Sequence, residues 1–379
     1  MEINTELNPT PHSERNHGIE LLRIFAMLLA AVLHILKKGG VIIASEGNLA
    51  AYSTVWLLEA AAYCAVNCYA LISGYVGYSD RPKPLRLARC IELWLQVVFY
   101  SVIITTVYCI AGVGSVGVSD FADAFLPVTS KQYWYFTAYI GMFFFIPLLN
   151  ALVRRLNRRA LVSLCIMLIA VFSLYDTFAS FWKKDPLALV GGHSPLWLGV
   201  LYIFGAAMKK LRVPESMSSK KALLIYASAV FTALFKITGD RLLRFVPGSL
   251  FVRDTSPTVL LCAAALLVAF ARFKPGRKLT EFAVLFAPAA FGVYLLHVSP
   301  LVFEHVIGNR FAFIGRLPFP LIPFAVLASA GVILAVGLAA DKVRILLFKA
   351  LGVPKLCRKA ENFIRRLWMH VVDAAANRE

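Results

Sequence analysis

Long apolar stretches alternate with short polar segments along nearly the whole chain. A membrane-spanning helix needs about 20 mostly apolar residues, because the hydrocarbon core of a bilayer is about 30 Å thick. Ten windows approach or meet this length, and the sixth is the shortest. They cover residues 19–38, 52–78, 91–111, 133–152, 160–176, 195–208, 222–238, 257–272, 284–307 and 319–340. We therefore predict an all-α polytopic membrane protein with about ten transmembrane helices.

The composition agrees with a membrane protein and excludes a water-soluble enzyme. Hydrophobic residues make up 59% of the chain and charged residues 16%, whereas soluble domains average about 45–50% and about 25%. The seven cysteines are scattered, mostly inside the apolar windows, where cysteine packs as a small hydrophobic side chain. We therefore expect neither a disulfide framework nor a metal site.

The positive charges are distributed in a way that predicts the topology. The formal net charge is +18, and most lysines and arginines fall in polar segments that face one side if all ten windows span the membrane. These segments are 81–89, 154–159, 209–221, 272–278 and the tail from residue 342. Cytoplasmic loops carry an excess of Lys and Arg. We therefore predict that both termini are cytoplasmic, and we expect no nucleic-acid partner.

The chain divides into three parts around a single membrane domain. Residues 1–17 form a polar cytoplasmic segment without the basic start of a signal peptide, residues 18–340 form the transmembrane domain, and residues 341–379 form a basic cytoplasmic tail. Between Lys355 and Val372, apolar side chains share about one helical face and alternate with Lys and Arg. This pattern is typical of an amphipathic helix in the lipid headgroup layer.

The first window contains three ionisable residues, Glu20, Arg23 and His34. Ionisable groups are costly inside a bilayer, so they are candidates for function. Arg23 and His34 share one helical face about 16 Å apart along the axis, and Glu20 lies one turn before Arg23 and can pair with it. Arg23 near the cytosol suits an anionic ligand such as a phosphate, and His34 suits a general base. The alternative is that both are packing residues satisfied by neighbouring helices.

A second group of polar residues follows the second window. Ser73 and Gly74 permit a close helix approach or a local break near its end. The next polar segment holds Arg81, Arg86 and Arg89, and the last two share a helical face at the start of the third window. They are either topological anchors or a clamp for the phosphates of a nucleotide-like donor.

Aromatic residues and a histidine mark two later windows. Tyr133 and Trp134 begin the fourth window, where they form either an interfacial aromatic belt or a platform that stacks on a sugar. Tyr294 and His297 share a face in the ninth window. His297 is either a hydrogen-bonded structural residue or a ligand-binding one.

Together these motifs resemble the acyltransferase-3 family of integral membrane acyltransferases, which modify cell-surface carbohydrates in bacteria. The resemblance covers roughly residues 15–340, and it rests on the order and membrane sidedness of five motifs. They are Arg23-x10-His34, Ser73-Gly74-Tyr75, Arg86-x-x-Arg89, Tyr133-Trp134-Tyr135-Phe136 and Tyr294-Leu295-Leu296-His297.

The resemblance implies transfer of an acyl group, most often acetyl, from cytosolic acyl-CoA to a hydroxyl of a cell-surface or lipid-linked glycan. The enzyme would lie in the bacterial cytoplasmic membrane and use acyl-CoA as a co-substrate, without a bound cofactor. The family's essential histidine and arginine match His34 and Arg23, and Arg86 and Arg89 match residues that help to hold CoA. His34 would act as a general base or carry the acyl group itself.

The complete set of candidate site residues follows from these motifs. We predict Glu20 beside Arg23 and His34 in the catalytic group. The predicted donor-binding group is Arg81, Arg86, Arg89 and Ser73, and the predicted glycan-binding group is Tyr133, Trp134, Tyr294 and His297. The rival hypothesis is a transporter or lipid-linked-sugar flippase, which gives no reason for these motifs to occur in this order.

Overall fold

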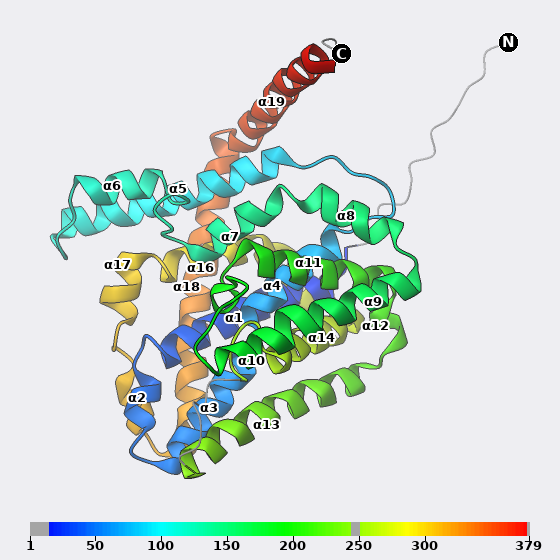
Figure 1. The fold of residues 1–379 in the computed structure, drawn as a ribbon. Helices are drawn as coiled ribbons and strands as arrows, with labels where there is room; N and C mark the ends of the chain where they lie inside the picture. Colours follow the sequence, from blue (N-terminus) through cyan, green and yellow to red (C-terminus); the bar gives the residue numbers. More distant parts are fainter. Residues whose placement is uncertain (1–14, 244–250, 377–379) are drawn as a thin grey trace.

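The computed structural model describes residues 15–243 and 251–376, and this part of the chain is α-helical without a β-strand (Figure 1). The predicted all-α fold is confirmed. Of the predicted N-terminal segment, residues 1–14 lie outside the described residues, as do residues 377–379 of the predicted tail. The helices are α1 His17–Leu36, α2 Val41–Ser45, α3 Leu49–Ala62, α4 Ala65–Gly77, α5 Leu87–Ala111, α6 Val118–Phe125, α7 Trp134–Phe143, α8 Ile146–Arg155, α9 Arg158–Ile169, α10 Asp176–Ser180, α11 Pro195–Lys210, α12 Val213–Ser216, α13 Ser219–Leu243, α14 Pro257–Arg272, α15 Arg277–Phe286, α16 Ala290–His297, α17 Pro300–Val302, α18 Ile322–Ala350 and α19 Val353–Ala376.

Seven helical stretches of the described residues are long and apolar enough to cross a membrane, so the chain is a multi-pass membrane protein. They are His17–Leu36, Leu49–Gly77, Leu87–Ala111, Arg158–Ser180, Ser219–Leu243, Arg277–His297 and Phe319–Ala350. An eighth results if α7 and α8, which bend by 57° at their junction, form one broken span. The sixth and eighth predicted windows, 195–208 and 257–272, overlap α11 and α14, which have 16 residues each. At 1.5 Å per residue such a helix is only about 24 Å long, so the total of about ten spans remains a prediction.

Helix α1 lies in the middle of the bundle and carries the predicted Arg23–His34 stripe (Figure 1). Its first turn is capped by Asn16, whose side chain accepts a hydrogen bond from the Ile19 amide, as Asn commonly does at this position. Helices α3, α4, α14, α16 and α18 pack around it. Most of its apolar side chains are buried, so its orientation is fixed by packing on several sides.

Helices α4 and α11 pack with their backbones in contact through two glycines. A Cβ atom added at Gly74 would lie 2.0 Å from the Tyr202 carbonyl oxygen, and one added at Gly205 would lie 2.0 Å from the Leu71 oxygen. Small residues at such positions let membrane helices approach closely. The close helix approach predicted at Gly74 is therefore confirmed, and it fixes the face of α4 that bears Ser73.

Helix α16 is held against α18 by a second pair of close glycine contacts. A Cβ at Gly337 would lie 2.9 Å from the Val293 backbone, and one at Gly292 would lie 2.3 Å from the Asp341 side chain. Gly292 and Val293 therefore lie on the face of α16 that contacts α18. The aromatic residues on either side of them, Phe291 and Tyr294, are directed toward the other neighbouring helices.

The C-terminal tail forms α19, which projects from the bundle beyond α18 (Figure 1). The segment from Lys355 to Val372 predicted as a helix lies inside it. Helix α19 contacts the start of α5, where the Leu87 amide donates to Glu361 at 3.1 Å. The hydrogen bond from Arg365 holds the pKa of the Glu361 carboxyl below its usual range. The location of this helix in the headgroup layer remains a prediction.

Candidate active site

The largest cavity that bears on the predicted site gathers arginines from three segments. It has a volume of about 480 Å³ and lies between α1, α4, α5, α7 and the start of α16. We name it the arginine cavity. Arg15, Arg23, Arg86 and Arg89 line it together with one acidic residue, Glu20. The excess of positive charge makes the cavity suitable for a multiply charged anion.

Within the described residues, the Arg23 guanidinium has neither an ion-pair partner nor a hydrogen-bond partner. The predicted pair between Glu20 and Arg23 is therefore wrong. Glu20 lies 3.4 Å from Arg15 and 3.4 Å from His17 instead, because these side chains reach it from the same turn. Glu20 still lines the arginine cavity and its charge acts on Arg23 from a distance, but its direct ion pairs are with the flanking residues, so the hydrogen-bond donors of the Arg23 guanidinium stay available.

A smaller cavity of about 60 Å³ contains His34, and we name it the histidine cavity. Trp134 and Tyr294 line it from α7 and α16. Three aromatic residues, Tyr69, Tyr135 and Phe291, line both this cavity and the arginine cavity. The two cavities therefore meet at an aromatic constriction along the Arg23–His34 stripe of α1.

His34 forms a hydrogen-bonded pair with His297, which comes from α16. His34 Nδ1 lies 2.9 Å from His297 Nε2, and His297 Nδ1 lies 2.6 Å from the Val293 carbonyl oxygen. A carbonyl oxygen only accepts, so His297 Nδ1 carries the hydrogen and its Nε2, in a neutral ring, only accepts. His34 Nδ1 must then donate, which leaves the lone pair on His34 Nε2. The edge of Phe303 packs against the His34 ring and restrains it further.

The structure brings together only part of the predicted donor-binding group. Arg86 and Arg89 line the arginine cavity, and Arg89 also lies 3.4 Å from Glu92. Ser73 lines it as well, although its hydroxyl donates to the Tyr69 carbonyl of its own helix. Arg81 is exposed and lines neither cavity, because it belongs to the irregular segment between α4 and α5. Its predicted place in the donor site is not supported.

Of the predicted glycan-binding residues, two line the histidine cavity and two do not. Trp134 and Tyr294 line the histidine cavity, but the His193 ring stacks on Trp134 at 3.8 Å and covers one of its faces. Tyr133 is fully buried and donates to the Leu295 carbonyl at 3.1 Å. Tyr133 is therefore a packing residue, and His297 is a partner of His34 rather than a lining residue.

Sequence reasoning missed several residues of the site. Tyr69, Tyr135 and Tyr139 line the cavities but occur in apolar windows as ordinary aromatic residues. His193 lies 3.2 Å from Asp254 through Nε2, and the two are distant in sequence. Only the proximity of Tyr135 to Trp134 offered a signal, and it was outweighed by the interfacial-belt interpretation.

A charged pair also lies beyond the histidine cavity, where Lys37 follows α1. Its Nζ lies 3.2 Å from the buried Glu59 carboxylate and donates to the Tyr63 hydroxyl. The Glu59 carboxylate thus balances the ammonium charge of Lys37 at this end of the site.

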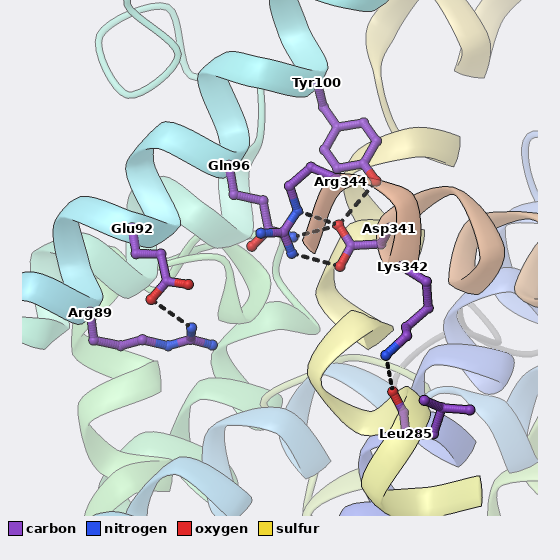
Figure 2. A network of polar contacts seen from close by, with 8 residues as sticks. All are labelled: Arg89, Glu92, Gln96, Tyr100, Leu285, Asp341, Lys342 and Arg344. Atoms are coloured by element: carbon purple, nitrogen blue, oxygen red, sulfur yellow. Dashed lines mark hydrogen bonds and ion pairs between the residues drawn. The ribbon is translucent and has the colours of Figure 1, made fainter. Parts of the chain in front are cut away.

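A buried polar network connects α5 and α18 beside helix α16 (Figure 2). Asp341 and Arg344 of α18 form an ion pair through two hydrogen bonds. Asp341 is 0% exposed and Arg344 is 5% exposed. Gln96 and Tyr100 of α5 each donate to Asp341 at 3.0 Å. Since Asp341 also contacts Gly292, the network ties α5 and α18 to the helix that carries Tyr294 and His297.

Comparison with known proteins relates most of the chain to one family. Residues 16–340 match the family model of the acyltransferase-3 group, which is described as an acyltransferase domain. No curated protein and no solved structure matches the chain. Apart from Arg15, the matched range includes every residue that lines the two cavities, and it covers nearly all of the helical bundle.

Proposed function

Since the chain belongs to the acyltransferase-3 family of membrane acyltransferases, we propose that it moves an acyl group, most simply acetyl, from cytosolic acyl-CoA to a hydroxyl of an envelope glycan. The observation that carries the proposal is the meeting of the arginine cavity with the histidine cavity along α1. A donor bound in the first cavity faces the aromatic constriction that separates it from His34. The family match favours this function over a transporter or flippase.

The charge of the arginine cavity supports CoA as the donor. Its arginines offer several planar guanidinium groups, which bind phosphates with paired hydrogen bonds, and the Arg23 guanidinium forms neither an ion pair nor a hydrogen bond among the described residues. A neighbouring cavity of about 340 Å³ adds Lys209 and shares Arg15 and Arg23. This space suits the phosphates and nucleotide of CoA, with the flexible thioester arm directed toward His34.

The His34–His297 pair supports general-base catalysis. In the proposed reaction His34 Nε2 removes the proton of the acceptor hydroxyl while the oxygen attacks the thioester carbonyl carbon. The carbon–sulfur bond then breaks, and the CoA thiolate takes the proton from His34, so no net charge is left. The same Nε2 is also the atom that would carry the acyl group in a two-step transfer. Either path places the acyl carbon in the histidine cavity.

The positive-inside pattern supports the membrane sidedness of this route. The arginine cavity opens beside the starts of α1 and α5, next to the basic polar segments that we assign to the cytoplasm. The histidine cavity lies farther along α1, toward the opposite side. A cytosolic donor and an acceptor from the outer side therefore approach His34 from different directions.

Arg23→Lys is expected to weaken binding of acetyl-CoA about tenfold, which corresponds to about 1.4 kcal/mol. Lysine keeps the charge but loses the paired, planar hydrogen bonds. The measurement is the acetyl-CoA dependence of thermal stabilisation of the purified protein, since a ligand that binds only the folded state raises its melting temperature.

Arg81→Lys serves as the matched control, because Arg81 is exposed and lines neither cavity. Its titration curve is expected to overlay that of the wild type. Equal affinities for the wild type and Arg23→Lys would contradict the donor role of Arg23. A wild type that acetyl-CoA does not stabilise would contradict the proposed function.

A further inference from the structure

The beginning of α7 presents amide groups that have no acceptor. Tyr133 occupies the position before the helix, and its side chain makes no capping hydrogen bond. The first internal hydrogen bond runs from the Thr137 amide to the Tyr133 carbonyl, so the amides of Trp134, Tyr135 and Phe136 have no backbone acceptor among the described residues. The start of a helix concentrates such donors and carries a partial positive charge.

An unpartnered hydroxyl lies beside these amides. Tyr294 is 7% exposed, and its hydroxyl is buried without a hydrogen-bond partner in the described part of the chain. The Tyr135 amide points toward the oxygen of this hydroxyl, whereas the hydroxyl hydrogen has no acceptor in the described part of the chain. A buried hydroxyl without a partner costs about 1–3 kcal/mol. A bound ligand with an acceptor atom at this position would remove that cost by accepting a hydrogen bond from the Tyr294 hydroxyl.

Both groups of donors belong to residues that border the space containing His34. Trp134, Tyr135 and Tyr294 line the histidine cavity together with His34, and most of the other lining side chains are apolar. Hydrogen-bond donors aimed into a dry, apolar site stabilise developing negative charge far more than they do in water. The cavity thus contains a base on one helix and a set of fixed donors on two others.

We propose that the start of α7 and the Tyr294 hydroxyl form the oxyanion hole of the acyl transfer. The inference rests on the proposed function and adds catalytic groups to it. When the acceptor oxygen attacks, the carbonyl electron pair moves onto the acyl oxygen, which becomes negatively charged. The Tyr294 hydroxyl and the amides of Trp134 and Tyr135, whose residues line the histidine cavity, donate to that oxygen. The pair then re-forms the carbonyl as the carbon–sulfur bond breaks, and the thiolate takes the proton held by His34.

Tyr294→Phe removes the hydroxyl and keeps the ring, so it tests the assignment with the least disturbance of packing. Loss of one oxyanion donor typically lowers kcat by about 10²–10³-fold. We expect a loss of about 10²-fold in kcat, with the KM for acetyl-CoA changed by less than about twofold because the ground-state carbonyl gains little from the donor. The control is Tyr133→Phe, which removes a neighbouring buried hydroxyl bonded to the Leu295 carbonyl and should leave kcat within about threefold of the wild type.

A spectroscopic measurement separates this assignment from the proposed function. The infrared carbonyl stretch of acetyl-CoA labelled with ¹³C at the carbonyl should move to lower wavenumber on binding to the wild type and to Tyr133→Phe. It should move clearly less on binding to Tyr294→Phe. Binding without any carbonyl shift, or equal kcat for the wild type and Tyr294→Phe, would overturn the oxyanion hole while leaving the proposed function intact. Absence of acetyl-CoA binding to the wild type would overturn the proposed function and this assignment with it.

Discussion

His34→Ala is expected to lower the rate of acyl transfer by at least about 10²-fold, because general-base catalysis typically contributes about 10²–10⁴-fold. His34 Nε2 is the ring nitrogen left with a lone pair by the hydrogen bonds of the His34–His297 pair. No other side chain lining the histidine cavity offers a basic nitrogen. The measurement is the initial rate of acetyl transfer by the purified protein in liposomes.

The control for this variant is His305→Ala. His305 packs against Tyr108 and lines neither the arginine cavity nor the histidine cavity, so its removal should leave the rate within about twofold of the wild type. The acetyl-CoA affinity of His34→Ala should match that of the wild type, since Arg23 and the donor cavity are unchanged. A folded His34→Ala protein with a rate within about threefold of the wild type would refute the catalytic role of His34.

Asp341→Leu is expected to destabilise the fold by about 3–5 kcal/mol, because removing one partner of a buried ion pair leaves the other charge uncompensated. Arg344 makes both of its ion-pair hydrogen bonds with Asp341, and Gln96 and Tyr100 also depend on that carboxylate (Figure 2). The measurement is the free energy of unfolding in mixed micelles titrated with a denaturing detergent.

The double variant Asp341→Leu/Arg344→Met tests whether the uncompensated charge of Arg344 causes the loss of stability. With both charges gone, no ion is left buried, and replacement of a whole buried pair by apolar side chains is often neutral. We expect the double variant to recover more than half of the stability lost by Asp341→Leu. An unfolding free energy for the single variant within about 1 kcal/mol of the wild type would contradict the structural role of the network.

The elements that follow from local patterns were predictable from the sequence. Apolar length predicted the membrane helices, and the spacing of Arg23 and His34 predicted their common stripe, which does line two adjoining cavities. Gly74 predicted a close helix approach that the structure confirms. These features depend on residues within one helix, so their geometry follows from the helical repeat.

The features that depend on contacts between distant segments were not predictable. His34 and His297 are 263 positions apart, and no spacing rule relates them. Asp341 and Arg344 were assigned to the cytoplasmic tail because charge ends an apolar window, yet α18 continues through them and buries both. Glu20 was expected to pair with Arg23 because both lie on one helix. Its carboxylate forms direct ion pairs with Arg15 and His17 instead. Tertiary contacts decide each of these cases.

The most direct test of the account is acetyl transfer across the membrane in inverted vesicles from the source cells. Radiolabelled acetyl-CoA added outside such vesicles reaches the cytosolic face, while the envelope glycan lies inside. We predict base-labile label in the enclosed glycan when the vesicles carry the wild-type protein, and none when they carry His34→Ala at the same level. Label in neither preparation, or equal label in both, would contradict the claim that a donor and an acceptor from opposite sides react at His34.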